Sequence, residues 1–297
     1  MDDTTANALA AEFGAHRAHL LGVAYRLLGS RTDAEDVVQD AWLRLSRTDR
    51  ATLEDLRGWL TTVTARLCLD QLRSARVRRE AYVGPWLPEP VVTAPDEPAE
   101  RAVTGEAVRL ALLVVLDRLP PEQRVAFVLH DLFGVPFAEV AAILAGTEPG
   151  ARQLASRARR TVARDAPPPP PRAEQERVFA AFAAACAGGD LRGLLAVLHP
   201  DVVLTSDGGG VVSAARRPVH GADRVGRLLT GLVTKAAGLA SYRLVTVNGD
   251  PGLYAEIDVP GSPFHGYRAV YTATVSGGQV TAVYAVLNPA KLPRTSR

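Results

Sequence analysis

The chain has very little lysine, very little cysteine and almost no net charge. Only Lys235 and Lys291 are lysines among its 34 basic residues, and the formal net charge of the 297 residues is +2. Such a balance excludes a molecule that is basic all over, so a nucleic-acid site would have to be a local cluster of arginines. The two cysteines, Cys68 and Cys186, lie far apart in the sequence. Two free thiols in a reducing cytosol are therefore favoured over a disulfide framework.

Long apolar runs are missing as well. The first residues, MDDTTANALAAEFG, are acidic and contain no basic segment followed by an apolar one, so we expect no secretory signal. No stretch approaches about 18 uninterrupted apolar residues, so we expect no membrane span and no membrane partner. The length allows two or three domains, and a hydrophobic content of 47% supports packed cores. These features predict a cytoplasmic protein with several domains.

The stretch from Leu119 to Val162 has the most informative pattern. Apolar spacing predicts a short helix over 137–144, and after a break at Ala145-Gly146 the hydroxyl of Thr147 can cap a second helix. Two short helices joined by a glycine-containing turn predict a helix-turn-helix, whose second helix can bond phosphates and base edges. The alternative is an ordinary amphipathic hairpin with a solvated basic face. The candidate DNA-binding residues are Thr147, Arg152, Gln153, Ser156, Arg157 and Arg160.

Residues from about Leu9 to Arg79 have helical periodicity, with a stop at Gly29-Ser30. The helix after this stop carries polar residues on one side and apolar residues on the other. A row of carboxylates is either a solvated face or an electrostatic contact for a basic partner. The polar row comprises Asp33, Glu35, Asp36, Gln39 and Asp40.

The last long helix of this region ends in a cluster of arginines. Cations at a helix C-terminus are favourable for stability alone. Four arginines within seven residues also make a candidate phosphate-binding patch. The cluster comprises Arg73, Arg76, Arg78 and Arg79.

Two proline-rich segments divide the chain. YVGPWLPEPVVTAPDEP contains five prolines and predicts an extended, irregular linker, in which Trp86, Leu87 and Pro88 form an apolar surface that needs cover. Pro167–Pro171 form a stiff spacer of about 15 Å. We therefore expect a domain boundary there, and we expect the tail to pack on the helical N-terminal region or on the WLPEP linker.

The tail has helical patterns first and strand patterns after them. This order predicts an α+β cone with an antiparallel sheet, and VSGGQV predicts a two-residue hairpin. No cluster has metal-ligand spacing, and Gly208–Gly210 lack the lysine and hydroxyl of a phosphate-binding loop. We expect neither catalysis nor a metal or cofactor, although Asp258 or Tyr271 could face a cavity. The polar candidates considered are His199, Asp201, Asp207, His220, Tyr254, Asp258, His265, Tyr271 and Tyr284.

Several motifs together resemble a known family. The runs DAEDVVQDAWLRL, GWLTTVTARLCLDQLRS and LPPEQRVAFVLHDLFGVPFAEVAAIL…RQLASRAR resemble the two conserved domains of extracytoplasmic-function (ECF) sigma factors of bacterial RNA polymerase, in the sigma-70 family. Gly-Asp followed by L…HPDVV and HG resembles the SnoaL-like cone domains. WLPEP, TSDGGG followed by AARRPVHG, and NPAKL resemble motifs of the SigJ-like group, which carries such a tail. Two departures are Val211, where lysine is expected, and Ala290, where aspartate is expected.

The resemblance implies a role for each polar set. The acidic helix would contact core RNA polymerase, the basic helix end the minus-10 element, and the helix-turn-helix the minus-35 element. The tail would act in cis where other sigma factors use a separate inhibitor. The residues assigned to this interdomain regulation are Trp86, Leu87, Pro88, Asp207, Gly208, Gly209, Gly210, Asn288 and Lys291.

The expected architecture is multidomain. It has two all-α domains, the second a helix-turn-helix, followed by an α+β SnoaL-like cone. The expected boundaries are 1–80 for region 2, 81–104 for the linker, 105–165 for region 4, 166–173 for the polyproline linker and 174–297 for the cone. The expected partners are core RNA polymerase and promoter DNA, with a small molecule in the cone as a further candidate. The alternatives are a one-component, ligand-responsive DNA-binding regulator, and an enzyme with a DNA-binding appendage.

Overall fold

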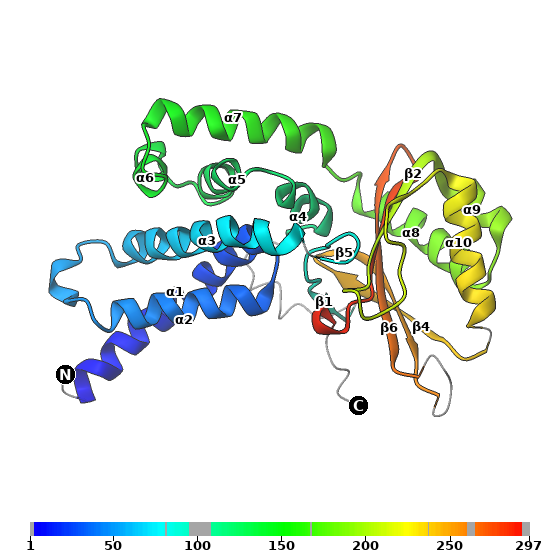
Figure 1. Ribbon diagram of the computed structural model, residues 1–297, viewed down its shortest axis with the longest axis horizontal. Helices are drawn as coiled ribbons and strands as arrows, with labels where there is room; N and C mark the ends of the chain where they lie inside the picture. Colours follow the sequence, from blue (N-terminus) through cyan, green and yellow to red (C-terminus); the bar gives the residue numbers. More distant parts are fainter. Residues whose placement is uncertain are drawn as a thin grey trace. The chain divides into compact units, whose positions relative to one another are not determined.

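The computed structural model describes residues 3–80, 82–94, 108–166, 168–236, 238–259 and 265–292, with backbone alone for 3–6 and 75–80. The chain divides into two compact units, each of which takes residues from separate stretches of sequence (Figure 1). The first unit comprises Met1–Glu80, Pro98–Val108 and Leu112–Pro167. The second comprises Ala81–Glu97, Arg109–Ala111 and Pro168–Arg297. The proline-rich linker therefore belongs to the same compact unit as the tail.

The first unit starts with three helices, as the periodicity predicts. They are α1 (Asp3–Leu28), α2 (Arg31–Leu45) and α3 (Leu56–Glu80), with a short 3₁₀ turn η1 (Arg50–Thr52) before α3. Gly29 has a φ of 71° and ends α1, and the Ser30 hydroxyl accepts the Asp33 N–H at 3.2 Å to start α2. Leu20, Leu27 and Leu60 are completely buried. The core of this part is therefore built from the apolar stripes of all three helices.

The helix-turn-helix lies in the same unit. It follows α4 (Leu110–Asp117), α5 (Pro121–Phe127) and the π-helical turn η3 (Val128–Leu132). Its two helices are α6 (Phe137–Ile143) and α7 (Glu148–Asp165), and the Thr147 hydroxyl accepts the Gly150 N–H at 3.3 Å. Helices α5 and α6 both pack against α7, and α3 packs against α5 and α6. The predicted positions of both helices and of the cap are confirmed.

The described part of the second unit is a seven-stranded sheet with helices against it (Figure 1). The strand order is β1-β4-β5-β6-β7-β2-β3. Phe179 and Phe182 of α8, Leu194 of α9 and Leu229 of α10 share one core with the sheet. The elements are α8 (Arg172–Ala187), α9 (Leu191–Val197), α10 (Ala222–Lys235), β1 (Val92–Thr93), β2 (Leu198–Asp207), β3 (Val219–His220), β4 (Ser241–Val247), β5 (Asp250–Ile257), β6 (Tyr267–Ser276), β7 (Gln279–Val286) and the 3₁₀ turn η4 (Pro289–Lys291).

Two expectations about this unit need correction. The sheet is mixed, because β2 and β7 are parallel, with Leu204 opposite Val283. The chain between these strands passes through α10 and the four strands β3, β4, β5 and β6, and β7 returns in the direction of β2. The linker is not wholly irregular, because its β1 pairs antiparallel with β4 and places Val92 opposite Val247. The Gly277-Gly278 hairpin is confirmed, with φ of 58° and 75°.

Candidate functional site

The outer face of α7 is exposed and polar. Ala151, Ala155 and Ala158 are buried on its inner face, so the backbone can approach the neighbouring helices closely. The sequence-predicted contact residues are all exposed: Thr147, Arg152, Gln153, Ser156, Arg157 and Arg160. A narrow helix with such a face has the shape and chemistry to enter a major groove.

Arg152 is held in place at the start of α7. It forms an ion pair with Glu148 one turn earlier, and its guanidinium lies 4.9 Å from the centre of the Phe137 ring. Its side chain nevertheless stays 61% exposed. These contacts reduce the number of arginine rotamers without removing the guanidinium from solvent, so the group remains available to another molecule.

The acidic row on α2 is exposed as well. Glu35, Asp36, Gln39 and Asp40 are exposed, whereas Asp33 is partly buried beside the cap of the helix. The opposite side is packed in the core through Ala34, Val37, Val38 and Ala41. The row is therefore a continuous anionic surface.

Of the four arginines at the basic end of α3, the structure describes the side chain of Arg73 alone. Arg73 is exposed and its Nη2 donates to Oε1 of Glu122 at 3.0 Å. The side chains of Arg76, Arg78 and Arg79 lie outside the described residues. Within the first unit, Nη2 of Arg66 also donates to the Ala142 carbonyl at 3.1 Å.

Arg124 is a structural residue that the sequence pattern did not reveal. Only 3% of it is exposed, and its Nη1 donates to the Leu27 carbonyl at 2.9 Å. Its Nη2 forms an ion pair with Asp117 at 3.0 Å. It therefore ties α1 to α5 inside the first unit. The available signal was an arginine next to the apolar run VAFVL, where a buried charge needs partners.

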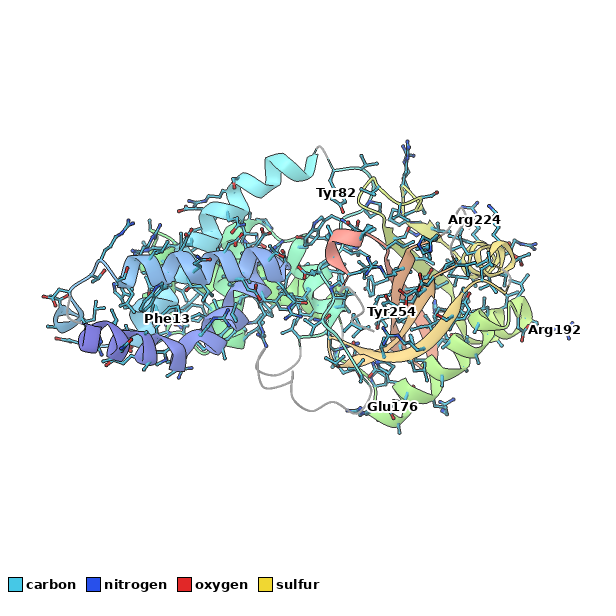
Figure 2. All side chains as sticks on the ribbon, turned by 90° about the horizontal axis from the view of Figure 1, so that it is seen from below. Phe13, Tyr82, Glu176, Arg192, Arg224 and Tyr254 are labelled. Atoms are coloured by element: carbon cyan, nitrogen blue, oxygen red, sulfur yellow. The ribbon has the colours of Figure 1, made fainter. Side chains whose placement is uncertain are left out.

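Asp207, the last residue of β2, holds the linker onto the tail. It is completely buried, and each carboxylate oxygen accepts two hydrogen bonds. Oδ1 accepts from the Tyr82 hydroxyl at 2.6 Å and from the Gly209 N–H at 3.0 Å. Oδ2 accepts from the Leu87 N–H at 2.9 Å and from Lys291 Nζ at 2.7 Å. Figure 2 shows Tyr82 beside the loop that follows β2.

Lys291 completes this contact from the end of the tail. Its Nζ also donates to the Leu87 carbonyl at 2.5 Å and lies 4.1 Å from the centre of the Trp86 ring. Nδ2 of Asn288 donates to the Tyr82 hydroxyl at 3.0 Å. We call the six residues Tyr82, Trp86, Leu87, Asp207, Asn288 and Lys291 the linker clamp.

Burial and the Asp207 carboxylate affect the ionisation of Tyr82. Burial, followed by the hydrogen bond to Asp207, raises the pKa of this phenol well above its ordinary value. Tyr82 therefore stays protonated and remains a donor to the carboxylate. Tyr82 had no place among the sequence-predicted residues, because a lone tyrosine before a proline-rich run gives no pattern.

The glycines after Asp207 allow the close approach. Gly209 and Gly210 have φ of 64° and 73°, which L side chains rarely adopt. A Cβ on Gly209 would lie 2.5 Å from the Asn288 side chain, and one on Gly208 would lie 2.3 Å from the Val212 carbonyl oxygen. Beneath them Leu87 is completely buried and Pro88 is buried. The apolar surface of the linker is thus covered by the tail.

Two further contacts anchor the segments around the clamp. The Val91 N–H donates to Oδ1 of Asn248 at 3.0 Å, and the Asn248 N–H donates to the Val91 carbonyl at 2.9 Å. Nε of Arg109 forms an ion pair with Asp250 at 3.0 Å, and Gln175 donates to the same carboxylate at 2.8 Å. Sequence reasoning missed these contacts, because Asn248 and Asp250 lie more than a hundred residues after Val91 and Arg109 in sequence.

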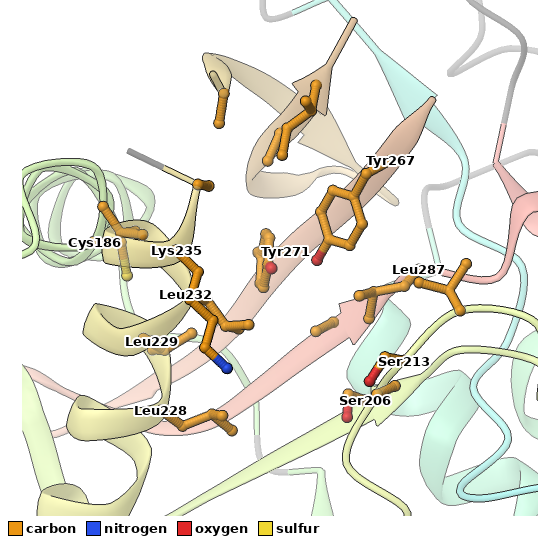
Figure 3. A pocket seen from close by; sticks show the side chains of 18 of the residues that line it. Cys186, Ser206, Ser213, Leu228, Leu229, Leu232, Lys235, Tyr267, Tyr271 and Leu287 are labelled. Atoms are coloured by element: carbon orange, nitrogen blue, oxygen red, sulfur yellow. The ribbon is translucent and has the colours of Figure 1, made fainter. Parts of the chain in front are cut away.

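The polar candidates of the tail are scattered. Tyr271 and His265 line a cavity beside α10 (Figure 3), whereas Asp258 is exposed and lies 3.6 Å from His265. Tyr254 is buried on the sheet, where the Arg243 guanidinium lies 4.2 Å from its ring centre. Asp201 and His220 are exposed, His199 is partly exposed and Tyr284 is buried. The candidates therefore do not converge on one site.

The two helical regions define a class of protein. Residues 13–78 match sigma-70 region 2, and residues 109–162 match sigma-70 region 4. The chain is 48% identical to the ECF RNA polymerase sigma factor SigJ of Mycobacterium tuberculosis, over 94% of this chain and 92% of that protein. It is 36% identical to the probable ECF sigma factor SigI of the same species, over 96% and 94%.

A solved structure agrees with this class over the whole chain. The crystal structure of M. tuberculosis SigJ superposes with a TM-score of 0.78 at 44% identity and covers 95% of this chain and 97% of that one. The chain belongs to the ECF RNA polymerase sigma factors. Its tail has the SnoaL-like α+β fold. Among the helices that the structure describes, none has both the length and the apolar character needed to cross a bilayer.

Proposed function

We propose that this sigma factor directs core RNA polymerase to a specific set of promoters in the cytoplasm, and that its tail controls this activity in cis through the linker clamp. The observation that carries the regulatory part is the buried Asp207 carboxylate, which accepts hydrogen bonds from Tyr82 and Leu87 of the linker and from Lys291 of the tail. A group buried at this cost needs all of its partners. Loss of any one partner should therefore weaken the whole clamp.

We assign one binding role to each of three polar surfaces of the first unit. The row on α2 would contact a basic surface of the polymerase, Arg73 and its neighbours at the end of α3 would contact the minus-10 element, and α7 would contact the minus-35 element. The supporting observation is that Asp36, Asp40 and Arg152 are all exposed. The sets on α2 and α7 are therefore accessible to a partner of opposite charge.

The clamp would control how far apart the two DNA-binding regions can lie. The linker joins region 2 to region 4 in sequence, and residues 82–94 could span about 45 Å if they were fully extended. While the clamp is closed, this length is used inside the second unit. If the clamp opened, residues 82–94 would again be available to lengthen the connection between region 2 and region 4.

Transcription in vitro with core polymerase tests the regulatory role. We would compare the full chain with its Asp207→Asn variant and with Asp201→Asn, which changes an exposed carboxylate on the same strand. A higher transcript yield for Asp207→Asn identifies the clamp as a restraint, and a lower yield identifies it as part of the active form. Equal yields from all three proteins would contradict control by the clamp.

Co-purification with core polymerase separates this proposal from a ligand-responsive regulator that acts alone. The double variant Asp36→Lys/Asp40→Lys should bind polymerase more weakly than the full chain, with a smaller dependence on salt. Asp223→Lys on α10 is a matched control, because Asp223 is an exposed helical carboxylate of the other unit. Unchanged binding by the double variant would contradict the assignment of α2.

The proposal assigns binding and not catalysis to the tail. Among the described residues that line its cavity there is no carboxylate. Its basic side chains are Lys235 and His265, and the rest of the wall is mainly phenols and aliphatic side chains, which suit retention of a ligand.

A further inference from the structure

The second unit encloses a cavity that the linker clamp does not use. It has a volume of about 640 Å³ and lies between α10 and the sheet (Figure 3). Cavities that hold small ligands commonly have about 300–1,000 Å³. The size therefore fits a molecule of several fused rings or an equivalent chain.

The wall of the cavity is mostly apolar. Leu228, Leu229 and Leu232 of α10 form one side, and Phe182 and Leu253 contribute from α8 and the sheet. Burial raises the pKa of the Tyr267 and Tyr271 phenols, and it raises the pKa of the Cys186 thiol to about 12. These groups are uncharged at neutral pH. The two basic side chains of the lining, Lys235 and His265, are exposed, so the buried part of the wall favours a neutral ligand.

Two phenols give the cavity a polar end. The hydroxyls of Tyr267 and Tyr271 point into it from β6 (Figure 3). A side-chain hydrogen bond joins the two phenols, and burial keeps both of them protonated. One such bond uses only one of the two hydroxyl hydrogens, so when Tyr271 donates to the Tyr267 oxygen, Tyr267 keeps its own hydrogen to donate. A ligand with an acceptor oxygen would satisfy it.

The cavity shares its wall with the linker clamp. Ser206 lines the cavity and is followed at once by Asp207 of the clamp, and Leu287 lines the cavity and is followed by Asn288. The loop Val211–Ala215 also lines the cavity. It is tied to β2 by the Ala215 N–H, which donates to the Ser206 hydroxyl at 3.1 Å. It is tied to the glycines by the Val212 N–H, which donates to the Gly208 carbonyl at 3.0 Å.

We infer that this cavity binds a neutral, largely apolar molecule with a carbonyl or similar acceptor oxygen, and that the bound molecule changes the stability of the linker clamp. The acceptor takes the Tyr267 hydrogen, and the apolar body fills the space against α10. Because Ser206 and Leu287 each precede a clamp residue, a ligand that moves the wall alters the position of Asp207 and Asn288. The coupling rests on the proposed role of the clamp, whereas binding itself does not.

Binding can be measured with Prodan, a neutral fluorescent naphthyl ketone, and the full-length protein. We expect saturable binding with a blue shift of its emission, because the probe leaves water. Tyr267→Phe should weaken Prodan binding by about fivefold, the loss of one hydrogen bond, and leave naphthalene binding unchanged. Tyr254→Phe is the matched control, since Tyr254 is a buried tyrosine of the same sheet that does not line the cavity.

Two results would overturn the ligand assignment. One is the absence of saturable Prodan binding up to its solubility limit. The other is equal Prodan affinity for the Tyr267→Phe variant and the unmodified chain. Leu232→Trp provides a second check, because Leu232 is partly exposed at the cavity wall and a larger side chain there should exclude both probes without disturbing the core.

Coupling is tested by hydrogen exchange of the peptide that contains Leu87. We expect Prodan to change the exchange rate of the Leu87 amide, which the clamp protects. Coupling is reciprocal, so Asp207→Asn, which weakens the clamp, should also change the Prodan affinity, by at most the factor by which Prodan changes the opening of the clamp. Prodan binding without either effect would overturn the coupling and leave the proposed transcriptional role untouched, since neither measurement involves polymerase.

Discussion

Two ion pairs in the two units of this protein have opposite environments. Arg152 and Glu148 on α7 have side chains that are 61% and 43% exposed. Lys291 and Asp207 in the linker clamp are 12% and 0% exposed. An exposed pair contributes little to stability, whereas removing one member of a buried pair leaves a charge without solvent or partner.

The difference shows how one chain uses charge for two purposes. The charges of α7 stay in water, where an arginine can exchange its glutamate for a phosphate or a base edge. The charges of the clamp are withdrawn from water and are satisfied by the chain itself. Exposed pairs should therefore affect binding and hardly affect stability, whereas the buried pair should affect stability directly and activity only through the clamp.

The largest expected loss of stability follows from breaking the buried pair of Asp207 and Lys291. Asp207→Ala should destabilise the second unit by about 3 kcal/mol, at the lower end of the range for a broken buried pair, because Lys291 keeps a small exposed area. Urea unfolding of the full chain measures this change. A loss below about 1 kcal/mol would mean that the clamp residues reach other partners after the substitution.

At the exposed end, Arg152→Ala should change DNA binding and not stability. A base-reading arginine gives about 1–3 kcal/mol of discrimination, whereas a phosphate contact weakens all sequences alike. Footprinting of the holoenzyme on cognate and altered minus-35 elements distinguishes the two. Arg172→Ala is the control, because Arg172 forms the same i,i+4 pair with Glu176 on α8. Equal footprints for Arg152→Ala and the unmodified chain would contradict a DNA contact by this residue.

His19 represents an intermediate degree of burial. Burial, with the nearby charge of Arg57, lowers the pKa of this histidine from 6.5 to about 4. The unfolded chain binds the proton near pH 6.5 and the folded chain only near pH 4, so stability is complete above 6.5 and is lost as the pH falls toward 4.

His19→Gln should reduce this loss by about 1 kcal/mol between pH 7 and pH 5, a value discounted because the ring is half exposed. Urea unfolding at pH 7 and pH 5 measures it. His16→Gln is the control, since it replaces another partly buried histidine of the same helix. An identical loss of stability in His19→Gln and the unmodified chain would show that other groups titrate in this range.

The smallest expected effect is at Asp223. Its pair with Arg227 has a distance of 2.9 Å, but both side chains are more than 60% exposed. The hydrogen bond from Arg227 lowers the pKa of Asp223, yet solvent screens the pair. Asp223→Ala should therefore leave the unfolding midpoint within error of the unmodified chain. A destabilisation as large as that of Asp207→Ala would overturn the comparison.

The sequence predicted the helical part well, because its information is local. Helical spacing, the Ser30 and Thr147 caps and the Gly29 stop lie within a few residues of the structure they determine. The same holds for the Gly277-Gly278 hairpin. The two-domain pattern of region 2 and region 4 follows from these local signals together with the motif order.

The tertiary partners could not be predicted in this way. Asp207, Asn288 and Lys291 were selected by their resemblance to group motifs, and only the structure shows that they surround one carboxylate. Tyr82 and Asn248 carry no motif, and their partners are more than a hundred residues away in sequence. The parallel pairing of β2 with β7 also depends on the path of the whole tail, which alternation within one strand cannot reveal.

The residues of the linker clamp are synthesised at different times. Lys291 is made about 125 residues after Ala166, the end of the described helical part. A ribosome needs on the order of ten seconds for this stretch. During that time Trp86 and Leu87 already exist, but Asp207 comes later and Lys291 comes last. Every newly made molecule therefore passes once through an unclamped form, which a finished molecule can reach again only by breaking the hydrogen bonds around Asp207.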